Sequence, residues 1–214
     1  MDDRREVMED KAGSVRARDN LFAAEKIERV RYKPQGATLD ALLATLAQMD
    51  YCGAIVGPEG SGKTTLLEDI AAALEDRGRP VRMVFVNDTS PMTWKSSREL
   101  LTQIDARQVV LLDGADTISR MTWPALKRGI VRKAAGLIIT AHKPGLMPTL
   151  IECQTTPVLF RQIVAEVVGS EKVVRPALLD EVYQRHNGNI REALRELYDL
   201  SADPATRQIL TVDR

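Results

Sequence analysis

Short apolar runs alternate with longer amphipathic segments through the middle of the chain. The runs are Gly53–Val56, Val81–Val86, Val109–Leu112 and Leu137–Ile139, with a weaker run at Val158–Phe160. Short, continuous apolar runs separated by helical segments are typical of strands in a parallel sheet, because both faces of such a sheet are covered. The pattern therefore predicts an α/β fold with a three-layer core of about five parallel strands.

The segments on either side of the first run have the spacing of amphipathic helices. Behind it, apolar residues recur at i, i+3, i+4 and i+7, at Leu67, Ile70, Ala71 and Leu74. The Gly78-Arg79-Pro80 sequence is expected to end this helix. Ahead of the run, Thr38 is predicted to cap a second helix, with Asp40 in its first turn.

The chain beyond residue 160 shows helical patterns only. Helices are predicted near residues 161–168, 176–186 and 189–200, followed by a polar tail at 205–214. At the other end, residues 1–20 are densely charged and carry few large apolar side chains. Such a segment cannot bury enough surface to offset its ordering entropy, so it predicts a mobile tail or a helix that forms on a partner.

Composition narrows the function classes. The 30 basic residues balance the 30 acidic ones, so net charge does not indicate nucleic acid or an anionic membrane as the partner. The N-terminal residues lack the apolar stretch of a signal peptide, and no run reaches the roughly 20 apolar residues that span a bilayer. Cys52 and Cys153 have neither metal-site nor redox spacing and are expected to be reduced thiols. We expect a cytoplasmic protein without membrane contact.

One motif carries specific chemistry. Eight consecutive residues match G-x-x-x-x-G-K-[ST] between a predicted strand and a predicted helix: Gly57, Pro58, Glu59, Gly60, Ser61, Gly62, Lys63 and Thr64. Glycines let the backbone wrap phosphates so that its N–H groups point inward, and the helix start adds partial positive charge. Lys63 is expected to contact the β- and γ-phosphates and Thr64 to bind Mg²⁺, with Thr65 completing the nucleotide-binding residues. The motif predicts a P-loop NTPase.

A second element supports this interpretation. The apolar run that starts at Val109 ends in Asp113, about fifty residues after the P-loop, as in a Walker B strand. Its carboxylate would lie at the carboxyl edge of the sheet, where it can hold Mg²⁺. The next run ends at Thr140, whose side chain could reach the γ-phosphate or the attacking water. His142 also lies at this strand end and could equally be a surface histidine without a role, so Thr140 is the first candidate.

Two helices have polar faces that allow more than one interpretation. In the C-terminal part, Asn189 is predicted to cap a helix that carries Arg191 and Arg195 on neighbouring turns. The helix after Asp113 has an apolar stripe at Trp123, Leu126, Ile130 and Val131. Four basic residues remain outside that stripe: Lys127, Arg128, Arg132 and Lys133. A solvated face is the simpler interpretation, and contact with nucleic acid or a partner is the alternative.

Taken together, these motifs resemble AAA+ ATPases, in particular the replication-initiator-like and related signalling branches, over about residues 35–200. The resemblance implies ATP and Mg²⁺ as ligands. It also implies that Thr140 occupies the sensor-1 position and that Arg191 is the sensor-2 arginine, which reaches from a helical lid to the γ-phosphate. The stretch Tyr32–Pro34 would then lie near the adenine, and a protein partner or self-association would be expected.

The chain departs from that family in three ways. Gly114 stands where the family usually has a glutamate that polarises the attacking water. The nearest substitute is Asp116, with Glu59 and Asp88 as more distant candidates. The segment AHKPGLMPTLIECQTTP contains no arginine to serve as a trans-acting finger, and the lid is short. These departures put rapid, ring-dependent hydrolysis in doubt and leave nucleotide binding untouched.

The sequence thus predicts a P-loop nucleotide-binding domain at residues 21–160 and a helical lid at 161–204. The leading function is a slow ATPase whose nucleotide state moves the lid and so regulates a partner. Its catalytic residues would be Lys63, Asp116, Thr140 and Arg191. One alternative is a nucleotide-binding switch or adaptor with negligible hydrolysis, which Gly114 would permit. A small-molecule kinase and a RecA-like motor are further alternatives.

Overall fold

The computed structural model describes residues 20–27, 30, 37–169, 172–203, 206 and 211–213. The chain divides into two compact units. The first, termed the sheet unit, comprises Arg31–Thr155, and the second, the helical unit, comprises Met1–Val30 together with Thr156–Arg214. Each unit is described by itself.

The sheet unit contains a five-stranded parallel sheet in the order β2-β3-β4-β1-β5. Its strands are β1 (Cys52–Val56), β2 (Val81–Phe85), β3 (Val109–Asp113), β4 (Gly136–Ala141) and β5 (Thr149–Glu152). The predicted α/β class and the number of strands are confirmed.

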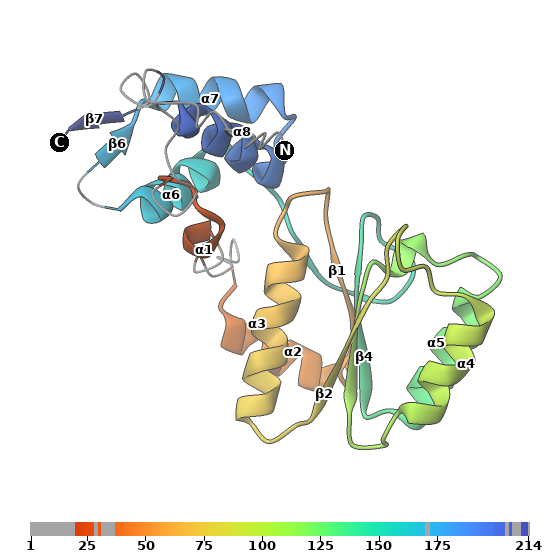
Figure 1. The fold of residues 1–214 in the computed structure, drawn as a ribbon. Coiled ribbons are helices and arrows are strands. Elements are labelled where there is room, and N and C mark those ends of the chain that lie inside the picture. The colour runs from red at the N-terminus through yellow and green to blue at the C-terminus, as the bar shows by residue number, and fades with distance from the viewer. Residues whose placement is uncertain are drawn as a thin grey trace, which may run out of the picture. The chain divides into compact units, whose positions relative to one another are not determined.

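Helices cover both faces of this sheet (Figure 1). The helices on one face are α2 (Leu39–Gln48) and α3 (Lys63–Asp76), and those on the other are α4 (Trp94–Gln103) and α5 (Trp123–Lys133). Each face has its own apolar core, and successive residues of β3 alternate between them. Val109 and Leu111 pack in the core with α2 and α3, whereas Val110 and Leu112 pack in the core with α4 and α5. The inner strands β1, β3 and β4 are buried on both sides, which explains their continuous apolar runs, whereas the edge strand β2 is only partly buried.

The predicted start of α2 and the predicted end of α3 are both present. The Thr38 hydroxyl accepts a 3.2 Å hydrogen bond from the N–H of Ala41 and so caps α2. Helix α3 ends at Asp76 with Arg77 as its C-cap, and the following Gly78 has a φ of 73°. That conformation is costly for residues with a Cβ atom, which explains the glycine at this turn.

Two sequence predictions in this region are wrong. Residues Val158–Phe160 are not a strand but lie in α6 (Pro157–Val168) of the helical unit, because Pro157 fits the first turn of a helix and the Thr156 hydroxyl accepts from the N–H of Leu159. The fifth strand is β5, a partly buried edge strand with only two apolar residues, Leu150 and Ile151. The second error is Val131, whose side chain is exposed rather than part of the buried stripe of α5.

The helical unit contains α1 (Ala24–Ile27), α6, α7 (Pro176–Arg185) and α8 (Ile190–Ala202), and a small antiparallel sheet of β6 (Lys172–Val174) and β7 (Thr211–Asp213). The two short strands do not appear in the sequence pattern. Asn189 caps α8 as predicted, by accepting from the N–H of Glu192.

An N-terminal segment completes the core of this helical unit. Leu21 and Phe22, which sequence analysis grouped with the nucleotide-binding domain, are buried among the apolar residues of α6, α7 and α8. The buried Asn20 fixes the segment, because its side chain donates to the carbonyl oxygen of Tyr198 and accepts from the N–H of Phe22 and the hydroxyl of Ser201. The apolar side chains of this segment therefore belong to the helical unit.

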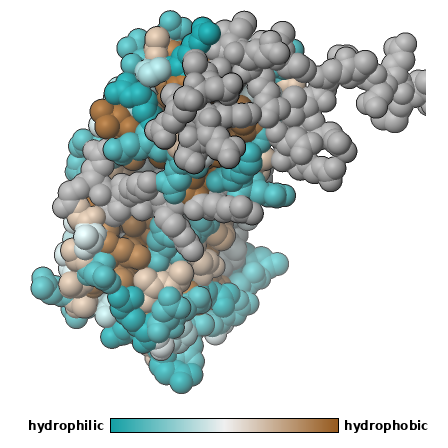
Figure 2. All heavy atoms as spheres, turned by 90° about the vertical axis from the view of Figure 1, so that its left-hand side faces the viewer, coloured by the Kyte–Doolittle hydropathy of each residue, from teal (hydrophilic) through white to brown (hydrophobic). Residues whose placement is uncertain are grey.

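Hydrophilic side chains predominate over the lower part of the face drawn in Figure 2. No helix within the described ranges is long and apolar enough to cross a membrane. Several sequence predictions fall outside those ranges: the mobile tail except for Asn20, the Tyr32–Pro34 stretch, and most of the tail at 205–214.

Candidate nucleotide site

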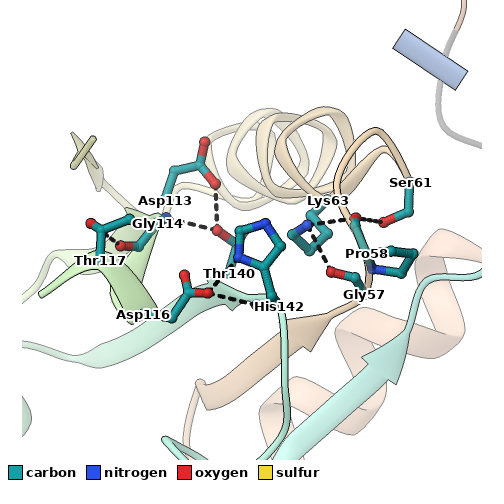
Figure 3. Close-up of polar contacts among 10 residues, drawn as sticks. All are labelled: Gly57, Pro58, Ser61, Lys63, Asp113, Gly114, Asp116, Thr117, Thr140 and His142. Carbon is teal, nitrogen blue, oxygen red and sulfur yellow. Dashed lines mark hydrogen bonds and ion pairs between the residues drawn. The ribbon is translucent and has the colours of Figure 1, made fainter. Parts of the chain in front are cut away.

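The P-loop connects the end of β1 to the start of α3, as the motif requires (Figure 3). Gly60 and Gly62 have φ values of 70° and 84°, and Gly62 is the N-cap of α3. Gly57 is a glycine for another reason. A Cβ atom there would lie 2.5 Å from the carbonyl oxygen of Cys153 and 2.8 Å from the Ser61 hydroxyl. The path of the loop backbone therefore requires glycine at these three positions. The loop leads directly into a helix N-terminus.

Lys63 reaches back over this loop. Its ammonium group donates 2.8 Å hydrogen bonds to the carbonyl oxygens of Gly57 and Pro58. Burial lowers the pKa of Lys63 below its ordinary value, although the negative charges of Asp116 and Asp113 oppose that effect. The contacts keep the cation at the mouth of the loop, close to both carboxylates.

Asp113 at the end of β3 joins the loop helix to the neighbouring strand. Its Oδ2 accepts a 2.9 Å hydrogen bond from the hydroxyl of Thr64, and its Oδ1 accepts from the hydroxyl of Thr140 at the end of β4. The buried Thr140 hydroxyl in turn accepts a 2.8 Å hydrogen bond from the N–H of Gly114. Three of the residues selected from the sequence thus form one connected network.

The donor set at Thr64 and Asp113 fits Mg²⁺. Magnesium prefers oxygen ligands and is usually bound by one or two protein groups together with waters and substrate phosphates. A threonine hydroxyl and a carboxylate in mutual contact at the start of the P-loop helix provide such a pair. Within the residues that the structure describes, there is no group of three or more His, Cys, Asp or Glu side chains that could hold a metal ion.

Gly114 cannot be exchanged for glutamate in this backbone. Its φ is +84°, and a Cβ atom there would lie 2.2 Å from the carbonyl oxygen of Val86. Val86 is itself held in place, because its N–H donates to the carbonyl oxygen of Asp113. The close approach between the ends of β2 and β3 therefore excludes a glutamate at position 114.

The substitute suggested from the sequence, Asp116, lies in the short 3-10 helix η2 (Ala115–Thr117) and contacts His142. Its Oδ2 accepts a 3.0 Å hydrogen bond from the N–H of His142 and lies 2.5 Å from Nδ1 of the same residue. Burial raises the pKa of Asp116, but the hydrogen bonds from the ring and the main-chain N–H of His142 oppose burial and help to hold that pKa below its usual value. Asp116 is therefore ionised at neutral pH.

Glu59 and Asp88 take no part in this network, and Arg191 belongs to the other unit. Glu59 and Asp88 are exposed, and Asp88 belongs to the turn between Asn87 and Ser90. Arg191 lies on the first turn of α8 in the helical unit. It is exposed and has no ion pair with the residues that the structure describes.

His142 was only an alternative to Thr140 in the sequence, and its pairing with Asp116 was missed. The available signal was a histidine directly after β4, at the sheet edge that also holds the P-loop.

The sequence model of the AAA domain family matches residues 47–213. No curated protein matches the sequence.

Solved structures extend the comparison to the fold. RuvB of Thermotoga maritima, a Holliday junction branch migration motor, has a TM-score of 0.56 at 16% identity, and the match covers 81% of this chain and 65% of RuvB. A point mutant of the same RuvB has a TM-score of 0.54 at 17% identity, covering 76% of this chain and 60% of that one. NtrX from Brucella abortus, in complex with ATP, has a TM-score of 0.48 at 16% identity, covering 83% of this chain and 52% of that one.

The chain spans less than two thirds of the length of these RuvB proteins. At such low identity the likeness to RuvB concerns the fold, which is that of a P-loop NTPase. The family match covers most of the sequence, including the P-loop, β3, β4 and the helices of the helical unit. The chain belongs to the AAA domain family.

Proposed function

We propose that this protein binds ATP with Mg²⁺ and hydrolyses it slowly, and that its nucleotide state moves the helical unit as a lid and so regulates a partner. The observation that carries the proposal is the contact network at the P-loop. Lys63, Thr64 and Asp113, three residues expected at a triphosphate site, lie together between β1, α3 and β3. A chance glycine-rich turn would not bring the Asp113 carboxylate onto the Thr64 hydroxyl.

The residues of the loop have separable roles in binding. The backbone N–H groups of residues 57–65 would surround the phosphates, and the Lys63 ammonium would exchange its two carbonyl partners for phosphate oxygens. Thr64 and Asp113 would hold Mg²⁺, which neutralises phosphate charge when bound. The Thr64 hydroxyl and the Asp113 carboxylate would exchange the hydrogen bond between them for contact with the ion.

Hydrolysis would depend on residues at the ends of β3 and β4. Thr140 would orient the γ-phosphate or the attacking water, and Asp116 would supply the carboxylate on which water activation depends. We expect slow turnover because Gly114 leaves no space for the usual glutamate. No arginine is present between β4 and α6 to act from a neighbouring copy.

The helical unit would act as the lid through Arg191. Its guanidinium group is exposed and has no ion pair with the described residues, so it is available to a γ-phosphate. Lid movement would be read by a protein partner or by another copy of the chain. Nucleic acid is a weaker candidate because the net charge is zero.

Phosphate release by the purified protein tests this function. Incubation with ATP and Mg²⁺, without any acceptor substrate, should give slow release of phosphate that Lys63→Ala abolishes. Amide hydrogen exchange of α8 should differ between ATP and ADP if the helical unit responds to nucleotide. Tight ATP binding without turnover would instead support the switch or adaptor, which the steric restriction at Gly114 favours.

A further inference from the structure

Asp116 and His142 form a pair beside the P-loop, and the proposed function gives a role only to the first of them. The two residues are 26 positions apart and come from η2 and from the end of β4. Two contacts hold the histidine, one to its main-chain N–H and one to Nδ1, and both go to the same carboxylate oxygen. Such double contact fixes both the position and the orientation of the ring.

The contact also determines which ring nitrogen can act as a base. The pKa of Asp116 lies below its usual value, so the carboxylate is ionised and can only accept hydrogen bonds. Nδ1 of a neutral His142 must then carry the proton, which leaves the lone pair on Nε2. Nε2 has no hydrogen-bond partner among the described residues, and the side chain is 50% exposed.

The ring lies at the reacting end of the proposed site. Thr140, two residues earlier on β4, is bonded to Asp113, and the negative charge of Asp116 acts on the Lys63 ammonium. In the view of Figure 3 the imidazole lies between Asp116 and Lys63. A phosphate held by Lys63 would therefore have an imidazole base, rather than a bare carboxylate, on the side of β4.

We infer that His142 accepts the proton of the water that attacks the γ-phosphate, and that Asp116 is its positioning residue. The inference rests on the proposed function, since it assigns roles within ATP hydrolysis. As the water oxygen bonds to the γ-phosphorus, the bond between this phosphorus and the β–γ bridging oxygen breaks, and its electron pair leaves with ADP. The proton of the water passes to Nε2, and the resulting imidazolium is stabilised by the Asp116 carboxylate until it releases the proton to solvent.

The roles of His142 and Asp116 would explain how water is activated at a site that has glycine at position 114. The backbone at that position excludes a glutamate, while the next turn supplies a carboxylate whose pKa lies below its usual value and which holds the His142 ring. General bases work best when their pKa is near the working pH, which favours imidazole over an ionised carboxylate. His142 and Asp116 together would thus activate the attacking water, which the family usually does with one glutamate.

The test uses the two histidines of the chain. His142→Ala removes the base, and His142→Asn keeps an N–H donor for Asp116 but has no basic nitrogen. His186→Gln is the matched control, because His186 also contacts a carboxylate, Glu196 at 2.6 Å, but lies in the helical unit. For each protein, Kd for ATP with Mg²⁺, kcat and the melting temperature are measured. Imidazole is then added to the hydrolysis assay.

Both His142 variants should lose about 10²-fold in kcat or more, with Kd for ATP changed by less than about threefold. Imidazole should restore part of the activity of His142→Ala, since the position is half exposed, and should not restore Asp116→Ala. His186→Gln should keep the wild-type kcat.

Unchanged turnover in His142→Asn, or a loss in His142→Ala that imidazole does not restore, would overturn the assignment while leaving ATP hydrolysis by the protein in place. A wild-type protein that binds ATP without turnover would overturn both the hydrolysis in the proposed function and the roles of His142 and Asp116. A wild-type protein that binds no ATP would contradict the proposed function as a whole. The three results are distinguishable.

Discussion

The hydroxyl of Thr64 donates a 2.9 Å hydrogen bond to Asp113, a residue 49 positions later in the chain. The contact joins the start of α3 to the end of β3, and it brings together the two residues that the sequence selects as magnesium ligands. Hydrogen bonding between them follows from the fold, because the carboxyl ends of parallel strands meet at one edge of the sheet. Their binding of Mg²⁺ remains a prediction.

Asp113→Asn should remove most of the effect of Mg²⁺ on ATP affinity. An amide retains the shape and can still accept from Thr64, but it carries no charge for a divalent cation. We expect Mg²⁺ to tighten ATP binding by about tenfold less in the variant than in the wild type, a difference of about 1.4 kcal/mol. Calorimetric titrations with Mg²⁺ and with EDTA measure it. Asp105→Asn, an exposed aspartate of the sheet unit, should leave the Mg²⁺ effect unchanged.

Gly114→Ala should destabilise the protein more than Gly78→Ala does. Both glycines have positive φ, so both substitutions carry the strain of that conformation, about 1–2 kcal/mol. Only at Gly114 does the new Cβ also collide, since Gly78 has nothing within 4 Å. Overpacking typically adds about 1–3 kcal/mol, which urea unfolding of the two variants can resolve.

Equal losses of stability at the two glycines would contradict the steric account of Gly114. The same account predicts that Gly114→Glu does not accelerate ATP hydrolysis, although it restores the residue type usual in the family. A Gly114→Glu protein that is stable and turns over faster than the wild type would show that the position tolerates a glutamate after all.

Asp116→Asn should lower kcat by about 10²-fold while ATP binding is kept. The carboxylate orients His142 and stabilises its charged form, and an amide does only the first. Glu59→Gln and Asp88→Asn are compared with it, because Glu59 is an exposed acid within the P-loop, Asp88 is an exposed acid after β2, and neither contacts His142. If either of these two substitutions suppresses turnover and Asp116→Asn does not, the assignment of Asp116 is wrong.

The sheet and the P-loop could be predicted because their signals are local. Three of the four apolar runs lie in inner strands that are buried on both faces, the fourth lies in the partly buried edge strand β2, and the eight loop residues lie next to one another. β5 was missed because only two of its four residues, Leu150 and Ile151, are apolar, and Val158–Phe160 were misassigned because Pro157 starts a helix there. Whether a short apolar segment becomes a strand or a helix depends on which neighbouring segments pack against it.

The remaining features depend on residues far apart in sequence. Asp116 meets His142 across 26 positions, and Asn20 meets Ser201 across 181, so no spacing rule could pair them. The close approach of Val86 to Gly114 is likewise a property of the packed sheet. From the sequence alone, Gly114 indicated only that a glutamate was missing; the structure adds that the backbone excludes one.

Arg191→Ala should weaken ATP binding by roughly tenfold or more and barely change ADP binding. A charge-assisted contact to the γ-phosphate would contribute about 1.5–3 kcal/mol, and ADP has no such phosphate. Arg195→Ala, on the next turn of the same exposed face, should have a smaller effect. Parallel titrations of both nucleotides into the two variants provide the comparison. Small and equal losses for ATP and ADP would contradict the lid role of Arg191.

The central claim, that a nucleoside triphosphate binds at the P-loop, is tested most directly by titrating ATP with Mg²⁺ into the wild type and Lys63→Ala. Lys133→Ala is the matched control, since Lys133 also donates 2.8 Å to a backbone carbonyl, that of Leu101, but on α5. Removing Lys63 takes away a loop contact rather than core packing, so the melting temperature should stay near that of the wild type. We predict tight binding by the wild type and Lys133→Ala and no measurable binding by Lys63→Ala. Equal affinity in all three proteins would contradict the account.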